Sequence, residues 1–288
     1  MRTVYLVILN CNNMNVLPAL CESLDVFLKN NTYPIEVRFI DQGSTDGSYE
    51  YLENYCEHCI DCINANVKRL KINIGPTKAW NLAIKDICSN YKYYLCLINS
   101  DMKVGVDFLA PMIDIMEKVP DCGMVSNTLR DYENIDFVQN AGPNLDDPWH
   151  YKMGWHYYRG KDMRPHVAEW GHMGCTLFKS EVFWDIGKFD ENFFIYSCDF
   201  DFQIRMKLAG WKIWFCPKSY AQHKTFITCN ELKKNSIIAE ICKKDGDYLH
   251  WKWGRNVLDW FNKNTSMDIN RNLKDIHGED YNLNEIYS

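Results

Sequence analysis

The stretch that decides the fold is IEVRFIDQGSTDGS at residues 35–48. Its first six residues are rich in Ile, Val and Phe, which is typical of a buried strand. The remainder is polar and contains two glycines, which indicates a loop that caps a following helix. We therefore predict a strand over 35–40, a loop over 41–48 and a helix over about 48–62.

The same order of strand, loop and helix extends along the chain on both sides of this stretch. The further predicted elements are strands at 4–9, 66–72, 93–98, 175–178 and 213–216, and helices at 17–28 and 77–88. Strands that alternate with helices are typical of an α/β fold, with a mostly parallel sheet and helices on both faces. We expect one catalytic domain over 1–225 and a helical extension over 226–288, while 104–168 shows less regular patterning.

The composition limits the class of protein. The 288 residues carry 32 Lys+Arg against 38 Asp+Glu, a net charge of −6, which argues against a general coat on nucleic acid. A local basic strip of Lys68, Arg69, Lys71 and Lys78 leaves a nucleic-acid acceptor open. No apolar run reaches the ~20 residues of a transmembrane helix, and no secretory leader is visible. We expect a cytoplasmic protein whose 13 cysteines are reduced.

Three of those cysteines form a C-x-x-C-x-x-C run at Cys56, Cys59 and Cys62. A zinc or iron–sulfur site needs four ligands, and no partner pair at a suitable spacing follows. Spacing of three also places thiols on one buried face of a helix, which is the interpretation we favour. A metal role stays open at this point.

Two polar clusters follow predicted strands, at 41–44 and at 99–101. Ligands of open parallel sheets bind at the carboxyl ends of the strands. Asp41 can accept hydrogen bonds from a base or a ribose, and the Asn99-Ser100-Asp101 sequence can coordinate a divalent cation that also holds a diphosphate. The alternative is that both aspartates only cap turns.

Five motifs occur in a characteristic order: VILNCNN at 7–13, FIDQGSTDGS at 39–48, NIGPTKAWN at 73–81, LINSD at 97–101, and GKFDENFF at 187–194 followed by CDFD at 198–201. Together they resemble the inverting glycosyltransferases of family 2, and among these the rhamnosyltransferase-like subgroup. The resemblance covers about residues 4–224. It implies the GT-A fold, a Rossmann-like α/β architecture, with a nucleotide-diphosphate sugar as the donor.

The resemblance also implies the roles of individual residues. The nucleotide would be bound by Asn10, Asn12, Asp41, Asn73, Gly75, Asn81 and Asn99. A divalent metal, Mn²⁺ or Mg²⁺, would be held by Asp101 and His223, and Asp199 would be the general base. The acceptor would contact Trp170, His172, Gly174 and Asp201.

Three of these assignments have alternatives. His223 is as well explained as an ordinary histidine, and Trp170 nearly as well by core packing. Asp201 can instead pair with Arg205 one turn later on a helix, which is the role we favour. Cys198 stands where relatives usually have a glutamate, and this bears on the geometry of the acceptor.

The expected activity is transfer of a hexose or deoxyhexose, with inversion, to a hydroxyl of a glycan or lipid-linked acceptor. Two other hypotheses remain: transfer to a modified nucleic-acid base, and a sugar-nucleotide-binding module without catalysis. Retention of Asp101 and Asp199 argues against the module.

Overall fold

The fold is that of a computed structural model, which describes residues 1–87, 91–140, 155–158, 164–224 and 236–254. Within them the strands are β1 (Val4–Asn10), β2 (Ile35–Asp41), β3 (Asn64–Arg69), β4 (Tyr94–Asn99), β5 (Met102–Val104), β6 (Cys122–Asp131), β7 (Val138–Asn140), β8 (Trp155–Tyr158), β9 (His166–Ala168), β10 (Cys175–Lys179) and β11 (Lys212–His223). The helices are α1 (Leu17–Asn30), α2 (Ser48–His58), α3 (Pro76–Ile87), α4 (Ala110–Lys118), α5 (Ser180–Ile186), α6 (Cys198–Leu208) and α8 (Ser236–Trp253).

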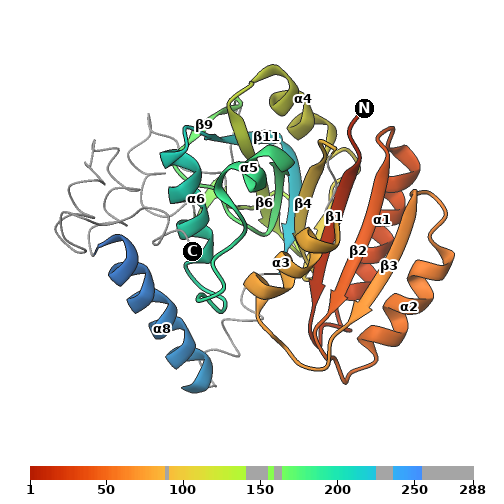
Figure 1. The fold of residues 1–288 in the computed structure, drawn as a ribbon. Helices are drawn as coiled ribbons and strands as arrows, with labels where there is room; N and C mark the ends of the chain where they lie inside the picture. Colours follow the sequence, from red (N-terminus) through yellow and green to blue (C-terminus); the bar gives the residue numbers. More distant parts are fainter. Residues whose placement is uncertain (88–90, 141–154, 159–163, 225–235, 255–288) are drawn as a thin grey trace.

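The strands form one sheet in the order β3-β2-β1-β4-β10-β6-β11-β5, and β7, β8 and β9 join it at the side (Figure 1). β3, β2, β1 and β4 are parallel, and α1, α2 and α3 occur between them in the chain. β10 is antiparallel to β4 and β6, whereas β11 is parallel to β6. The carboxyl ends of β1, β2 and β4 therefore lie together, with Asn10 opposite Asp41 and Leu9 opposite Asn99.

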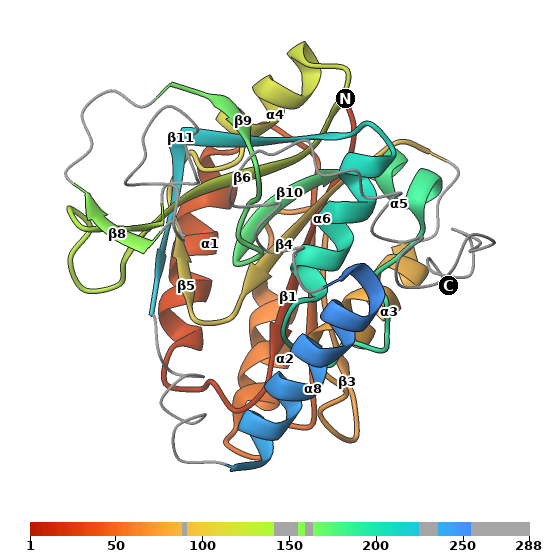
Figure 2. The ribbon, with the colours of Figure 1, turned by 90° about the vertical axis from the view of Figure 1, so that its left-hand side faces the viewer.

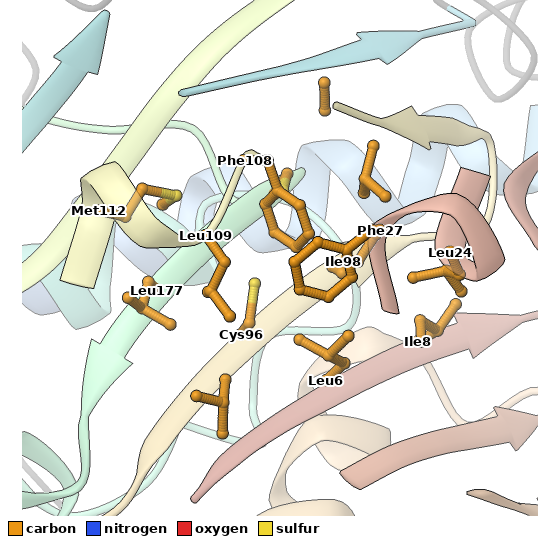
Figure 3. Close-up of a cluster of buried hydrophobic side chains, with 14 of the residues drawn as sticks. Leu6, Ile8, Leu24, Phe27, Cys96, Ile98, Phe108, Leu109, Met112 and Leu177 are labelled. Carbon is orange, nitrogen blue, oxygen red and sulfur yellow. The ribbon is translucent and has the colours of Figure 1, made fainter. Parts of the chain in front are cut away.

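Helices cover both faces of the sheet, as Figure 2 shows. Because side chains alternate along a strand, neighbouring residues of one strand enter different cores. Leu6 and Ile8 of β1 belong to the core under α1, α2 and α4, while Val7 belongs to the core under α3, α5, α6 and α8. Figure 3 shows the first of these cores, where the rings of Phe27 and Phe108 lie 4.7 Å apart. Burial on both faces explains why these strands are continuous apolar runs.

The predicted fold class, an α/β fold with a mostly parallel sheet and helices on both faces, is confirmed. Some boundaries were wrong. The strand predicted at 66–72 is β3 (Asn64–Arg69), and the helix predicted over 48–62 ends at His58. The stretch over 104–168 holds α4 and β6, two regular elements that its patterning did not indicate.

The predicted C-terminal extension contains one described helix, α8, and residues 225–235 and 255–288 lie outside the described part. α8 does not stand apart from the rest of the fold, because Leu249 and Trp253 are buried in the same core as α3 and α6. Figure 2 shows α8 beside α6, to which the hydrogen bond from Trp253 Nε1 to Asp201 joins it. Within the described residues, no helix is both long enough and apolar enough to cross a membrane.

Candidate active site

The ends of β1 and β2 form a buried polar cluster around Asp41. Asn10 Nδ2 donates to Asp41 Oδ1 at 2.9 Å and to Ser44 Oγ at 3.1 Å, and the Ser44 backbone N–H donates to Asp41 Oδ2 at 3.0 Å. Asp41 is fully buried, so its carboxylate organises the loop that follows β2. Asn10 Oδ1 is also buried and has no hydrogen-bond partner among the described residues. It is an acceptor available to a ligand at this edge of the sheet.

Asn12 lies above this cluster and is exposed. Its backbone adopts a left-handed conformation with φ of 52°, which asparagine tolerates better than most residues. Its N–H donates to Ser44 Oγ at 2.9 Å, and its Oδ1 accepts from the Thr45 N–H at 2.8 Å. These hydrogen bonds join the loop after β1 to the loop after β2.

Asn73, Gly75 and Asn81 lie at the entrance to α3 and within it. Asn73 is exposed, and its Oδ1 accepts from the Gly75 N–H at 2.9 Å. Gly75 has φ of +83°, and a Cβ there would lie 2.5 Å from the carbonyl oxygen of Phe194, so only glycine fits without a shift. Asn81 is buried, and its amide both donates to Phe189 O at 2.7 Å and accepts from Phe189 N–H at 2.9 Å. Asn81 therefore joins α3 to the segment before α6, which is a structural task.

The predicted metal ligands Asp101 and His223 lie side by side. Asp101 follows β4 and His223 ends β11, and Asp101 Oδ2 lies 3.5 Å from His223 Nε2. Asp101 Oδ1 and His223 Nδ1 are buried and have no hydrogen-bond partner in the described part of the chain. A carboxylate oxygen beside an imidazole nitrogen is a donor pair that fits Mn²⁺, whereas Mg²⁺ prefers oxygen alone. No cluster of three or more His, Cys, Asp or Glu suited to a metal ion occurs among the described residues, so further ligands would come from substrate or solvent.

The segment over 170–174 crosses the sheet between α6 and the end of β4. Gly174 O accepts from the Asn99 N–H at 2.8 Å, and Gly171 is bonded to Gln203 of α6 through both its N–H and its carbonyl. Trp170 is half-buried, and its ring centroid lies 6.2 Å from that of Phe200. This segment therefore connects the two sides of the candidate site.

His172 of the same segment is buried, and its Nε2 lies 2.7 Å from Asn127 O. Burial lowers the pKa of His172 to about 4, so the ring is neutral near pH 7. Its position favours a role in holding the segment in place over direct contact with a sugar. A Cβ on Gly174 would lie 2.3 Å from Met102 Cε, so a larger residue there would displace the end of this flexible side chain.

Asp199 lies in the first turn of α6 and is partly exposed. The preceding Ser197 has φ of 64°, a left-handed conformation that turns the chain sharply into the helix. Burial raises the pKa of the Asp199 carboxyl above its usual range, although the Phe200 N–H donates to Oδ1 at 2.9 Å and opposes the rise. A carboxylate of raised pKa is suited to accept a proton.

Asp201 is fully buried, unlike Asp199. Its Oδ2 accepts from Arg205 Nε at 3.0 Å, and its Oδ1 accepts from Trp253 Nε1 at 2.8 Å and lies 3.0 Å from Lys252 Nζ. These contacts support the structural role for Asp201, paired with Arg205, that the sequence analysis favoured. They leave no accessible oxygen for an acceptor.

Contacts link the predicted residues into one continuous edge of the molecule. In order they join Cys11 to Asn73, Gly75 to Phe194, Phe200 to Trp170, Gly174 to Asn99, and Asp101 to His223. The structure thus brings together the ends of β1, β2 and β4 with the start of α6. Asn10 lies at the end of β1 and Asp199 in the first turn of α6.

Two residues with a part in this arrangement were missed by the sequence analysis. Ser44 joins both loops of the cluster around Asp41, and its place within the 39–48 motif was a signal for it. Asp245 of α8 accepts hydrogen bonds from the segment before α6. Nothing in its neighbourhood in the sequence marks it.

The run Cys56, Cys59 and Cys62 lies away from this edge and packs partly buried against the core under α1. Only Cys56 belongs to α2, so the prediction of three thiols on one helix face was wrong. Cys59 Sγ and Cys62 Sγ lie 3.2 Å apart as free thiols. Burial raises the pKa of both Cys56 and Cys59 to about 12, which opposes the thiolate form that a metal binds.

The fold and the site define a protein of the GT-A class. The pattern of glycosyl transferase family 2 matches residues 5–187, and the chain belongs to this family. The family and the enzyme class, a glycosyltransferase, are as predicted from the five motifs.

Among curated relatives, an N-acetylglucosaminyl-diphospho-decaprenol L-rhamnosyltransferase of Mycobacterium tuberculosis is 22% identical over 213 residues, which is 66% of each chain. The chain is similar in fold to GalNAc-T7 bound to UDP, GalNAc and Mn²⁺, with a TM-score of 0.66, 16% identity, and 96% of this chain and 55% of that one covered. It is also similar to the mannosyltransferase PcManGT of Pyrobaculum calidifontis with GDP-Man and Mn²⁺, with a TM-score of 0.55, 19% identity, and 78% and 57% covered. The chain thus spans about two thirds of the curated relative and just over half of each structure.

Proposed function

We propose that the protein transfers a hexose or deoxyhexose, with inversion, from a nucleotide-diphosphate sugar to a hydroxyl of a glycan or lipid-linked acceptor. The observation that carries the proposal is the position of Asp199. It lies in the first turn of α6 with a carboxyl of raised pKa, and the segment over 170–174 connects this turn to Asn99, two residues before the Asp101–His223 pair.

Inversion in one step needs a base on the side of the sugar opposite the leaving diphosphate. Asp199 would take the proton of the acceptor hydroxyl as its oxygen attacks the anomeric carbon. Asp101 and His223 would hold a divalent cation, whose charge offsets that of the leaving diphosphate. Asn10, with its unpartnered Oδ1, would accept a hydrogen bond from the nucleotide.

The names of the relatives support the substrate classes. The mycobacterial relative is an L-rhamnosyltransferase named for a lipid-diphosphate acceptor, which favours a deoxyhexose donor and a lipid-linked acceptor here. The similar structures hold UDP or GDP-Man together with Mn²⁺, which favours a nucleotide-diphosphate donor and a manganese ion.

A nucleic-acid acceptor is less well supported. Two of the four residues of the basic strip are already paired: Lys68 Nζ lies 2.6 Å from Asp86, and Arg69 lies 3.3 Å from Glu50. Paired side chains contribute little net charge toward a phosphate backbone. This favours a glycan or lipid-linked acceptor over a nucleic-acid base.

The test is to replace Asp199 by Asn in the full chain and to assay transfer with a panel of nucleotide sugars and Mn²⁺. We expect kcat to fall by about 10²–10⁴-fold while donor affinity stays unchanged, because only the proton transfer is lost. Asp114→Asn, an exposed carboxylate on α4, is the matched control and should keep full activity. Equal turnover of Asp199→Asn and the wild type would exclude Asp199 as the base.

A further inference from the structure

α8 presents an unusual buried face to the segment that leads into the candidate site. Asp245, Leu249, Lys252 and Trp253 are all buried, at spacings of four, three and one residues, which places them on one side of the helix. Two of these four are charged, and buried charges require partners. Their hydrogen-bond and ion-pair partners show which part of the chain α8 contacts.

The carboxylate of Asp245 receives three consecutive backbone N–H groups. Phe194 N–H donates to Oδ1 at 3.0 Å, and the N–H groups of Ile195 and Tyr196 both donate to Oδ2, each at 2.8 Å. Asp245 is 3% exposed, so these bonds are shielded from water. Hydrogen bonds to an ionised acceptor are about twice as strong as neutral ones. One side chain therefore fixes the path of three successive peptide groups.

This segment leads directly to Asp199. Only Ser197, with its left-handed conformation, and Cys198 lie between the third bonded amide and Asp199. On its other side the segment is confined by α3, because Thr77 Oγ1 donates to Phe194 O at 3.4 Å and Gly75 leaves no room beside that carbonyl. The segment therefore lies between α3 and α8, and Asp245 provides the hydrogen bonds from the α8 side.

Lys252, the other charged residue of this face, forms ion pairs with residues before and after the segment. Lys252 Nζ lies 2.6 Å from Asp190 Oδ2 and 3.0 Å from Asp201 Oδ1. Asp190 precedes the segment, whereas Asp201 follows Asp199 within α6. Side chains of α8 thus contact Asp190 before the segment, the amides of 194–196 within it, and Asp201 after the proposed base.

We propose that Asp245 is a positioning residue for Asp199: by binding the amides of 194–196 it sets where the carboxylate of Asp199 stands relative to the bound sugar. This inference rests on the proposed function. α8 is the first described element after β11, and both α8 and the segment over 194–196 lie beyond residue 187, where the family match ends.

The decisive variant is Asp245→Asn, which keeps the size of the side chain but replaces one acceptor oxygen by an NH₂ group that cannot accept. We expect amide hydrogen exchange over 194–196 to accelerate at least ~10-fold, because these N–H groups lose a charged acceptor. We expect kcat, normalised to the folded fraction, to fall by about 10²-fold, the effect of misplacing a reacting group by ~1 Å. Donor affinity should change by less than about twofold, because α8 bonds none of the predicted nucleotide ligands among the described residues.

Asp247→Asn is the matched control, since Asp247 lies on the same helix with its side chain 64% exposed. It should leave both kcat and exchange at 194–196 at their wild-type values. Asp245→Glu retains the carboxylate and should recover part of the lost kcat. Unchanged exchange in Asp245→Asn, an unchanged kcat, or a loss of donor affinity that matches the loss of kcat would each overturn the proposal.

Failure of the proposed function would look different. In that case wild type, control and variant would all lack transfer with every donor tested. The exchange measurement would still decide whether Asp245 holds the 194–196 amides, since unchanged exchange in Asp245→Asn overturns the inference without any reference to activity.

Discussion

Replacing Lys252 by Met tests the energetics of the buried charges under α8. The side chain of Lys252 is 1% exposed, and its two partners Asp190 and Asp201 are 2% and 0% exposed. Burial raises the pKa of Asp190, but hydrogen bonds, chiefly from Lys252, outweigh it and hold this pKa below its usual range. Met has a similar length but no charge, so the variant removes one cation and leaves two buried carboxylates behind.

The expected loss of unfolding free energy is about 3–5 kcal/mol, the cost of breaking a buried ion pair from one side. Arg205 and Trp253 still bond Asp201, which places the estimate nearer 3 than 5. The midpoint of thermal unfolding should fall by on the order of 10 °C. The same substitution at Lys244 removes a pair with Glu240 on the same helix, but this lysine is 72% exposed, so its loss should stay within ~0.5 kcal/mol.

The assay is urea unfolding at pH 7 followed by tryptophan fluorescence and by circular dichroism. Combining Lys252→Met with Asp190→Asn should cost less than the sum of the single changes, by a coupling of about 1–3 kcal/mol. Equal losses for Lys252→Met and Lys244→Met, or additive losses in the double variant, would refute the reasoning.

Two further predictions concern a glycine and an acidic transition. Gly75→Ala should cost about 1–3 kcal/mol of stability in a thermal melt, because φ is +83° and the new Cβ meets Phe194 O. Gly246→Ala in α8 has open space around it and should stabilise the helix by up to ~1 kcal/mol. Equal shifts of the melting temperature in the two variants would contradict this prediction. Burial raises the pKa of Glu181, but hydrogen bonds, first among them that from Arg2, outweigh it and lower this pKa to about 2. A carboxyl whose pKa is lower in the folded than in the unfolded chain stabilises the fold at pH values above the unfolded pKa. The contribution of Glu181 to stability should therefore be lost as pH falls from about 4.5 toward 2. In Arg2→Gln the urea midpoint should fall less steeply over this pH range.

The parallel half of the fold, and the strand or helix end at which several candidate site residues lie, could be predicted from the sequence because the information there is local. Asp41 follows the strand predicted at 35–40 directly, Asp101 follows the one at 93–98 after two polar residues, and parallel strands bring their ends to one edge. Asp199 lies in a motif that resembles one of the family. For these residues, the neighbouring sequence is enough to predict the strand or helix end at which they lie.

The remainder depends on contacts between distant parts of the chain. β6 was missed because Ser126 and Asn127 are fully buried within it, which interrupts the apolar run that indicates a strand. Asn81 was assigned to the nucleotide, but its amide is bonded to Phe189, 108 residues away. Asp245 had no local signal, because its partners are backbone groups about 50 residues earlier.

The bonds from α8 to the segment before Asp199 also have a consequence for biosynthesis. A chain emerging from the ribosome grows by ~5–20 residues per second, and its N-terminal parts fold first. β1 to β4 can pair while the rest is still being made, but the amides of 194–196 have no carboxylate to bind until Asp245 has emerged. The sheet can therefore assemble early, while the last adjustment of the proposed catalytic segment waits for a helix made some 50 residues later. An incomplete nascent chain would hold a folded sheet without a finished site.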